Sequence, residues 1–256
     1  MHNFLVRKHK MASSLLPPKC SDAPLVHEPL VQQEQQLVKK LATFNVLFDI
    51  GNSRVRSYAD ARYKKQLQMF ANLNANVLCL NEVTMNLYTL LKNDPFILAN
   101  YFMYADPSVS KCDNASYFGN VILTRIKPLY AFYLTWEDKN IAHRPGIIVV
   151  LPLNISNDEN SKPQCIAIAS AHFKAFNDMA HVRKQQYEEC LAVFNFLKHE
   201  HSTHFGYDLF ECFLAGDLNP HLKEEESFLN LHEDMWTLLH YGHAKEENFG
   251  EMQFDE

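Results

Sequence analysis

The sequence has 256 residues, of which 47% are hydrophobic and 21% charged, with 7 glycines against 18 phenylalanines and 11 tyrosines. This composition is typical of a globular protein and excludes collagen-like, linker-like and low-complexity chains. The formal net charge of −6 excludes a surface that binds polyanions everywhere, although it is compatible with a local basic groove.

Targeting signals and cysteine clusters are not evident in the sequence. No apolar run approaches the roughly 20 residues that cross a bilayer, and no apolar core of signal-peptide length follows the basic residues of 1–10. The six cysteines include no C-x-x-C pair, and four of them lie in apolar runs, where a thiol behaves as a small buried hydrophobe. We expect a monomeric intracellular protein of the nucleus or the cytoplasm, with neither a zinc cluster nor a disulfide framework.

Hydrophobic periodicity predicts the order of the elements. Residues 1–38 contain four prolines between 17 and 29 and a glutamine-rich run, so a flexible N-terminal tail is predicted there. Apolar runs then predict strands at 42–48, 77–80, 118–124, 147–153, 166–171 and 212–215. Apolar residues at helical spacing predict helices at 62–73, 85–91 and 181–198. Because both faces of a sheet must be covered, this series indicates one layered α/β domain over 39–256.

Polar residues interrupt or end several of the predicted strands. They are Asn45, Glu82, Asn120, His172, Asp217 and Asn219. Strand ends are where α/β proteins place their sites, because rigid strands aim short side chains at one point. Acids, amides and a histidine that converge there suit a hard cation such as Mg²⁺, which leaves coordination positions for water and phosphate oxygens.

Each of these residues also has a purely structural interpretation. A glutamate after a strand is commonly a solvated loop residue, and a histidine there is commonly a structural hydrogen-bonding group. Asp217 and Asn219 after Gly216 are compatible with a simple turn, and Asn45 with a cap on a neighbouring backbone group. Only the whole series indicates a site.

Five short motifs follow one another on successive predicted strands. They are Thr43-Phe-Asn45, Leu80-Asn-Glu-Val83, the run from Tyr117 to Arg125, Ser170-Ala-His172 and Gly216-Asp-Leu-Asn219, and an Arg-x-x-Gln follows the fourth at Arg183. This series, over roughly residues 41–255, resembles the endonuclease/exonuclease/phosphatase superfamily. The resemblance implies a four-layer αββα sandwich of the DNase I-like type. Within the superfamily the sequence is most similar to the tyrosyl-DNA phosphodiesterase 2 group, also through residues 233–236 and 252–255.

The resemblance implies a metal-dependent phosphodiesterase that uses Mg²⁺, with Mn²⁺ as the alternative. Glu82 would hold the metal, with Asn45 contributing to the same cluster. Asp217 would orient or deprotonate the attacking water, and Asn219 would hold the water or the phosphate in line. His172 would donate to a phosphoryl oxygen.

The same resemblance implies how the substrate is bound. Asn120 and Arg183 would bind phosphate. The partner would be nucleic acid, as a single-stranded DNA end or a protein–DNA adduct such as a 5′-tyrosyl end, in DNA repair. Poly(A) RNA, a phosphoinositide and sphingomyelin remain alternative substrates of the same chemistry.

The C-terminal region departs from the pattern of the superfamily. That pattern ends on a Ser-Asp-His strand whose histidine acts at the phosphate, and this sequence contains no Ser-Asp-His. We therefore expect a domain that is incomplete at its C-terminal end. Four histidines in this region are not part of a Ser-Asp-His motif, and we expect them to be surface or helix residues: His221, His232, His240 and His243. A chain that binds without cutting is the alternative from another functional class.

Overall fold

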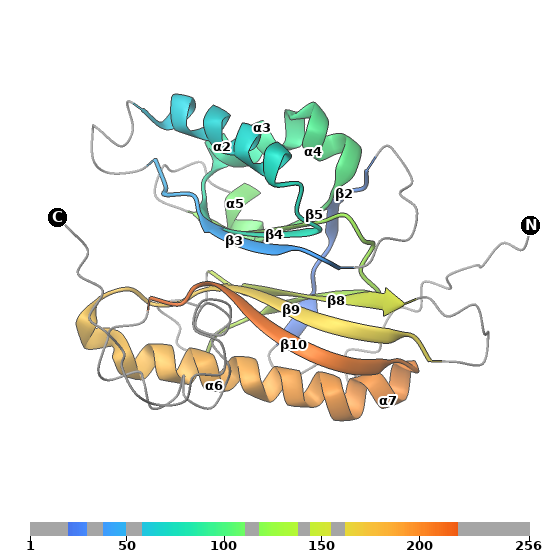
Figure 1. Cartoon of the computed structure of the whole chain (residues 1–256). Helices are drawn as coiled ribbons and strands as arrows, with labels where there is room; N and C mark the ends of the chain where they lie inside the picture. Colours follow the sequence, from blue (N-terminus) through green and yellow to red (C-terminus); the bar gives the residue numbers. More distant parts are fainter. Residues whose placement is uncertain are drawn as a thin grey trace, which may run out of the picture. The chain divides into compact units, whose positions relative to one another are not determined.

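The computed structural model describes residues 20–29, 38–49, 58–110, 118–137, 144–154 and 162–219. They form two five-stranded sheets that pack face to face, with helices on the two outer faces (Figure 1). The predicted αββα arrangement is therefore confirmed. No helix among the described residues is long and apolar enough to span a membrane.

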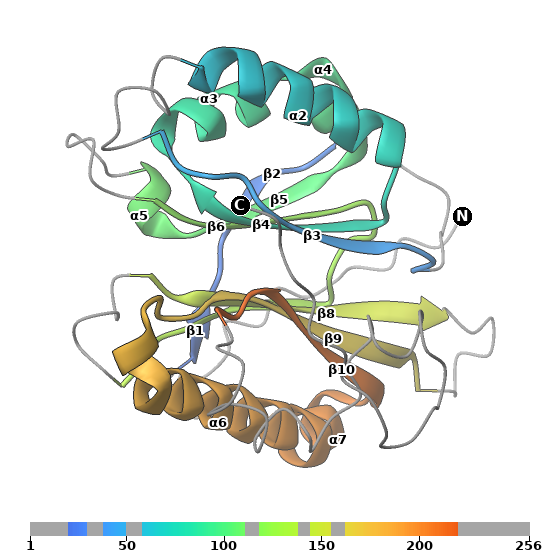
Figure 2. The ribbon, with the colours of Figure 1, turned by 60° about the vertical axis from the view of Figure 1, so that its left-hand side comes forward.

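The first sheet has two parallel strands at one side and is otherwise antiparallel. In spatial order it contains β2 (Leu25–His27), β5 (Phe102–Ala105), β6 (Gly119–Thr124), β4 (Val77–Val83) and β3 (Leu41–Asn45). Its outer face is covered by α2 (Ala59–Leu73), α3 (Met85–Asn93) and α4 (Pro95–Asn100), and the short α5 (Pro107–Ser110) follows β5 (Figure 2).

The second sheet follows the same plan, with β9 and β10 parallel and the other pairs antiparallel. In spatial order it contains β1 (Cys20–Asp22), β7 (Tyr130–Leu134), β8 (Gly146–Asn154), β9 (Gln164–His172) and β10 (Asp208–Asp217). The 3₁₀ turn η2 (Asn177–Met179) leads into α6 (Ala180–Phe196), which continues through the π-helical turn η3 (Leu197–His201) into α7 (Ser202–Phe205). These helices cover the outer face of the sheet (Figures 1 and 2).

Side-chain alternation along the central strands builds the core. In β4, Leu78 and Leu80 pack toward the helices, whereas Val77 and Cys79 pack between the sheets. Successive residues of a strand point to opposite faces, so a strand that is covered on both faces buries its side chains in both directions. This is why all seven residues of β4 are buried, including the site residue Glu82.

The two parallel pairs bring four strand ends together. β3 runs parallel to β4 and β9 parallel to β10, so each pair ends at one edge of its sheet. In Figure 1 these ends lie on the same side of the sandwich. The polar residues that end the strands are thereby placed near one another.

The N-terminal tail predicted over 1–38 is wrong for part of that segment. β1 pairs with β7 and β2 pairs with β5, so both lie within the sandwich. Pro24 separates the two strands, and each is the outermost described strand of its sheet, where proline interrupts no ladder. The sequence analysis also missed β5, β7 and α4, and it extended β3 to residue 48 whereas the strand ends at Asn45.

Candidate active site

Three of the predicted site residues form one cluster where β4, β9 and β10 end. Glu82, His172 and Asp217 each place one possible ligand atom within 4.8 Å of the others. The Nε2 atom of His172 lies 3.8 Å from Oε1 of Glu82 and 3.9 Å from Oδ2 of Asp217. The first sheet supplies Glu82 and the second supplies the other two residues, so the cluster lies across the interface between the sheets.

Asn45 joins the two carboxylates. Its Nδ2 atom donates to Oε1 of Glu82 at 3.0 Å and to Oδ2 of Asp217 at 2.7 Å. The second oxygen of Glu82 accepts from the backbone N–H of Phe48 at 2.9 Å. Both carboxylates are thus oriented by neutral donors, which leaves their negative charge available to a cation.

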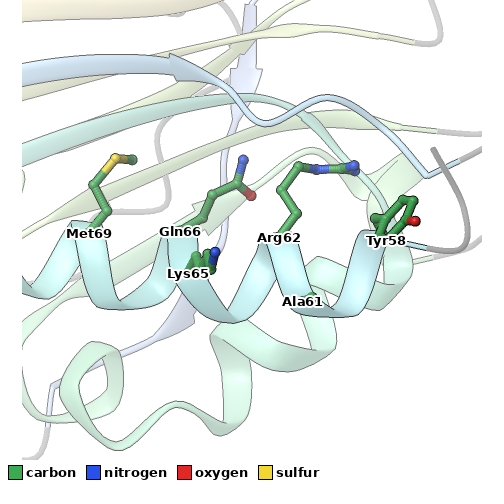
Figure 3. Close-up of a pocket in the computed structure, with 6 residues that line it drawn as sticks. All are labelled: Tyr58, Ala61, Arg62, Lys65, Gln66 and Met69. Atoms are coloured by element: carbon green, nitrogen blue, oxygen red, sulfur yellow. The ribbon is translucent and has the colours of Figure 1, made fainter. Parts of the chain in front are cut away.

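Helix α2 fixes the chain segment that follows Asn45. Figure 3 shows a pocket along α2 that contains none of the cluster residues. From this helix Gln66 Nε2 donates to the carbonyl of Val46 at 3.1 Å, and Arg62 Nη2 donates to that of Leu47 at 2.6 Å. The helix therefore holds the segment that carries the Phe48 donor to Glu82.

The backbone is strained at Glu82. This residue has a positive φ of 61° and lies where the pairing between β4 and β6 shifts register. A bulge with an unusual backbone conformation redirects one side chain out of the regular alternation. It brings the Glu82 carboxylate to the cluster from a strand that is apolar over Val77–Leu80.

A buried asparagine links the two sheets beneath the cluster. Asn81 is fully buried, and its Oδ1 atom accepts from the backbone N–H of Asp217 at 2.9 Å. Its Nδ2 atom donates to Oδ1 of Asn120 at 2.7 Å and to the carbonyl of Ala171 at 3.2 Å. Asn81 therefore sets the position of Asp217 relative to the end of β9.

The Gly-Asp-Leu-Asn motif forms a tight turn at the end of β10. The backbone N–H of Asn219 donates to Oδ1 of Asp217 at 3.0 Å, and its Nδ2 atom donates to the carbonyl of Phe173 at 3.0 Å. Asn219 adopts a φ of 48°, which asparagine tolerates better than most residues. Both carboxylate oxygens of Asp217 are held, one by Asn219 and the other by Asn45.

The protonation of His172 is set by burial and by its charged neighbours. Burial is the largest influence and lowers the pKa of His172, and the nearby Arg144 lowers it further. The charges of Glu82 and Asp217 act in the opposite direction. The net lowering favours a neutral imidazole at neutral pH, which carries one N–H donor and one acceptor nitrogen.

Arg144 is a site residue that the sequence analysis missed. Its guanidinium carbon lies 3.9 Å from the ring centroid of Phe118, whose ring centroid is 5.7 Å from that of His172. The ring of Phe48 also stacks on that of Phe118, with the ring centroids 4.8 Å apart. Burial lowers the pKa of Arg144, while the charges of Glu82 and Asp106 oppose that shift. The Nε atom of Arg144 is buried without a hydrogen-bond partner among the described residues.

Strand pairing is the signal that places Arg144 at the site. Ile147 of β8 pairs with Ser170 of β9, and the strands are antiparallel. The chain just before β8 therefore lies beside the end of β9, where His172 is. An arginine directly before a predicted strand identifies this position only if the partner strand is known.

Two predicted phosphate-binding residues have other hydrogen-bond partners. Asn120 is fully buried and donates to the carbonyl of Pro145 at 2.9 Å, besides accepting from Asn81. The Arg183 side chain is also fully buried, and it donates to the carbonyls of Lys174 and Phe176. These contacts assign supporting roles and do not favour direct phosphate binding. Residues 221, 232, 240 and 243, with the matches at 233–236 and 252–255, lie outside the described residues.

The donor set fits a divalent cation. Two partly buried carboxylates this close repel each other unless a cation neutralises them. The oxygens of Glu82 and Asp217 suit Mg²⁺ or Mn²⁺, and the nitrogen of His172 is a better ligand for Mn²⁺ than for Mg²⁺. Glu82 would hold the ion, with Asn45 fixing its distance from Asp217.

Comparison with known proteins gives matches of structure only. No protein-family model and no curated protein sequence matches the chain. The human Nocturnin catalytic domain with bound sulfate is 18% identical over 77% of this chain and 72% of that chain, with a TM-score of 0.50. ANGEL2, described as a 2′,3′-cyclic phosphatase, is 15% identical over 84% of this chain and 61% of that chain, with a TM-score of 0.50. A humanized D. rerio TDP2 is 15% identical over 73% of this chain and 69% of that chain, with a TM-score of 0.49.

The matches to Nocturnin and ANGEL2, together with the two-sheet architecture, define a DNase I-like α/β sandwich. The neighbours are members of the endonuclease/exonuclease/phosphatase superfamily, and the resemblance inferred from the motifs is confirmed at the level of the fold. At these identities the likeness concerns the fold, and the chemistry has to be argued from the cluster itself.

Proposed function

We propose that the protein is a metal-dependent phosphodiesterase that acts at nucleic-acid ends. The observation that carries this proposal is the cluster of Glu82, His172 and Asp217, joined by Asn45 at the ends of parallel strands. Oriented carboxylates, a histidine and a nearby arginine are the groups that hydrolysis of a phosphodiester requires. A phosphodiesterase-type activity is also the function of the superfamily whose fold the chain shares.

In this proposal Asp217 acts on the attacking water. The water oxygen forms a bond to phosphorus, its proton passes to Asp217, and the ester bond breaks with its electron pair on the leaving oxygen. Asn45 and Asn219 hold both carboxylate oxygens of Asp217, so the base is oriented before substrate binds. When bound, the metal ion supplies positive charge that neutralises a non-bridging phosphate oxygen.

His172 and Arg144 act on the phosphate in the same proposal. The N–H of a neutral His172 donates to a phosphoryl oxygen, and the Arg144 guanidinium adds positive charge beside it. Phe118 holds the guanidinium plane by a cation–π contact, so its donors are restricted in direction. Such preorganised charge is the largest contribution in most enzymes that stabilise a developing anion.

A nucleic-acid substrate is supported by the motif resemblance and by the chemistry described for one neighbour. ANGEL2 is described as a 2′,3′-cyclic phosphatase. The likeness of Leu80–Val83 and Gly216–Asn219 to tyrosyl-DNA phosphodiesterases makes a 5′-tyrosyl single-stranded DNA the first substrate to test. Poly(A) RNA and a phosphoinositide are the alternatives.

The test is cleavage of these three substrates with Mg²⁺ or Mn²⁺, and with EDTA as the metal-free control. We expect metal-dependent cleavage of a nucleic acid, and a fall of about 10²- to 10⁴-fold in Asp217→Asn. Asp208→Asn, at the exposed start of the same strand, is the matched control and should cleave normally. A folded chain that cleaves none of the substrates, or an Asp217→Asn chain with full activity, would disprove the proposal.

Metal binding can be measured apart from activity. We expect Glu82→Gln to weaken Mn²⁺ binding about 10- to 100-fold, because it removes one charged oxygen ligand. Titration of free Mn²⁺ followed by electron paramagnetic resonance gives the dissociation constant directly. Glu211→Gln, on the exposed part of β10, should bind Mn²⁺ as the unmodified chain does. Equal affinity in Glu82→Gln would exclude Glu82 as a ligand.

A further inference from the structure

Phe176 is an exposed aromatic residue in a strained backbone conformation. Its side chain is 69% exposed, and its φ is +83°. A bulky residue with positive φ is an outlier that persists only where the surroundings hold it. Such outliers concentrate at binding and catalytic sites. Stability alone would favour glycine at this position.

Arg183 is the group that holds this conformation. Its buried guanidinium donates through Nη1 to the carbonyl of Phe176 at 2.7 Å and to that of Lys174 at 2.8 Å. From the next turn of α6, Gln186 Oε1 accepts from the backbone N–H of Lys174 at 2.9 Å. Arg183 and Gln186 therefore fix the backbone of the loop from the buried side of α6, and the Phe176 side chain remains exposed to solvent.

The loop that carries Phe176 is attached to the catalytic cluster. The backbone N–H of Phe173 donates to the carbonyl of Asp217 at 2.9 Å, and its carbonyl accepts from Nδ2 of Asn219 at 3.0 Å. Phe176 is four residues from His172, which limits their Cα separation to about 14 Å. The connection from β9 to α6 lies at the end of the sandwich where β9 and β10 finish (Figures 1 and 2).

We propose that Phe176 is a stacking platform for a nucleobase next to the scissile phosphate, and that Arg183 is its positioning residue. This inference rests on the proposed function, and it identifies the substrate as one that carries a flat ring within one or two nucleotides of the reacting phosphorus. Base–aromatic stacking tolerates any sequence, because every base has a π face. It requires an exposed ring whose backbone is fixed in advance, which is the arrangement at Phe176.

The first test measures binding to a single-stranded oligonucleotide in an Asp217→Asn background, by fluorescence anisotropy. Phe176→Ala should weaken binding about 5- to 100-fold, and Phe176→Trp should retain it. Phe210→Ala is the matched control, because Phe210 is 67% exposed on β10 and lies seven residues before Asp217. An abasic oligonucleotide should bind the Phe176→Ala chain and its parent equally.

The results separate failure of this inference from failure of the proposed function. Equal binding of the base-containing oligonucleotide by the Phe176→Ala chain and its parent overturns the stacking role, even where cleavage is observed. If Phe176→Ala weakens binding of the abasic strand equally, the stacking role is overturned too. The same holds if Phe176→Ala weakens binding to phosphoinositide vesicles but not to the oligonucleotide. Absence of phosphodiester cleavage overturns the proposed function, whereas the binding comparison still tests Phe176.

Arg183 is tested by the separation of KM from kcat on the cleaved substrate. Arg183→Met should raise KM for the base-containing strand by the same factor as Phe176→Ala and leave KM for the abasic strand unchanged. A chain that carries both substitutions should have the same KM as the Phe176→Ala chain. Arg183→Lys should recover part of the effect, and it provides the test where Arg183→Met fails to fold. An Arg183→Lys chain that loses kcat equally on both substrates contradicts a positioning role.

Discussion

Gly216 shows how a single residue sets the spacing of the catalytic strands. It precedes Asp217 and has a φ of +126°, which favours glycine. A Cβ atom built there would lie 1.9 Å from the carbonyl oxygen of Ala171, the residue before His172. The absence of a side chain therefore allows β10 to lie against β9 where both carry site residues.

Substitution of this glycine should be severe. We expect Gly216→Ala to lower the free energy of unfolding by more than about 3 kcal/mol, because the clash is with backbone that cannot move aside. Gly206→Ala is the control, since that glycine also has a positive φ, of +72°, but an added Cβ meets nothing within 4 Å. Its cost should be about 1 kcal/mol. Urea unfolding compares the two, and equal costs would contradict the steric explanation.

Asn81 connects the two sheets at one buried amide. We expect Asn81→Ala to cost about 2–4 kcal/mol, because it leaves Asn120 and the N–H of Asp217 without their partner. Asn93→Ala removes an exposed amide that donates to the carbonyl of Thr89 in the same helix, α3, and should cost less than about 0.5 kcal/mol. Thermal unfolding measures both, and a small effect at Asn81 would exclude this link.

At the scale of single residues, the sequence predicted the cluster better than its surroundings. Asn45, Glu82, His172 and Asp217 were predictable because each ends or interrupts an apolar strand, and parallel strands end together. Arg144 was not, since its proximity to His172 depends on the register between β8 and β9. Helical spacing could not show that Arg183 points inward, toward backbone carbonyls.

The π-helical turn at the end of α6 buries a histidine among aromatic rings. His201 is almost completely buried, its Nδ1 atom lies 2.8 Å from the Tyr207 hydroxyl, and Tyr130, Phe132 and Phe205 surround it. Burial lowers the pKa of His201 to about 4, and His204 adds to the shift. The imidazole is therefore neutral in the folded protein.

This burial predicts a loss of stability in mild acid. Below pH 6.5 the unfolded chain binds a proton at residue 201 that the folded chain does not bind until about pH 4. Stability should fall by up to about 3 kcal/mol across that interval and should not change from this group above it. Urea unfolding at pH 4.5 to 8 measures the slope. His201→Phe should remove the contribution of one proton from the dependence of the free energy of unfolding on pH. His199→Gln, at an exposed histidine, serves as the control.

The long central elements were predictable, whereas the short ones were not. The runs at β4, β6, β8 and β9 are apolar because they are covered on both faces, and α2 and α6 carry apolar residues at helical spacing. β5 and β7 are four and five residues long, and they are rich in aromatic residues that fit either a strand or a helix. Their assignment depends on partner strands distant in the sequence, which a local pattern does not contain.

At the scale of the whole fold, one short segment joins both sheets. β1 is the outermost described strand of one sheet and β2 of the other, with Ala23 and Pro24 between them. Ala23 is buried between the sheets, whereas Val26 packs on the core beneath the helices. The segment covers two strand edges that would otherwise be open to pairing with other chains.

Removal of residues 1–29 should therefore destabilise the protein and promote association. We expect a lower unfolding midpoint by calorimetry and a rise in static light scattering, because β5 and β7 become edge strands. Lys127→Ser is the control, since it removes the exposed ion pair to Glu28, worth at most about 1 kcal/mol, and a cation–π contact with Phe102 at 6.0 Å, but leaves both strands in place. An unchanged midpoint in the shortened chain would show that the segment contributes little.

The position of this segment also has a consequence for biosynthesis. Asp22 is translated about 110 residues before its partner Phe132. At typical elongation rates of about 5–20 residues per second, β1 waits on the order of 5–20 s for β7. During that interval it is an unpaired nascent strand that a chaperone can bind. Pairing at this edge of the sandwich therefore has to wait for a strand that is made about 110 residues after the segment itself.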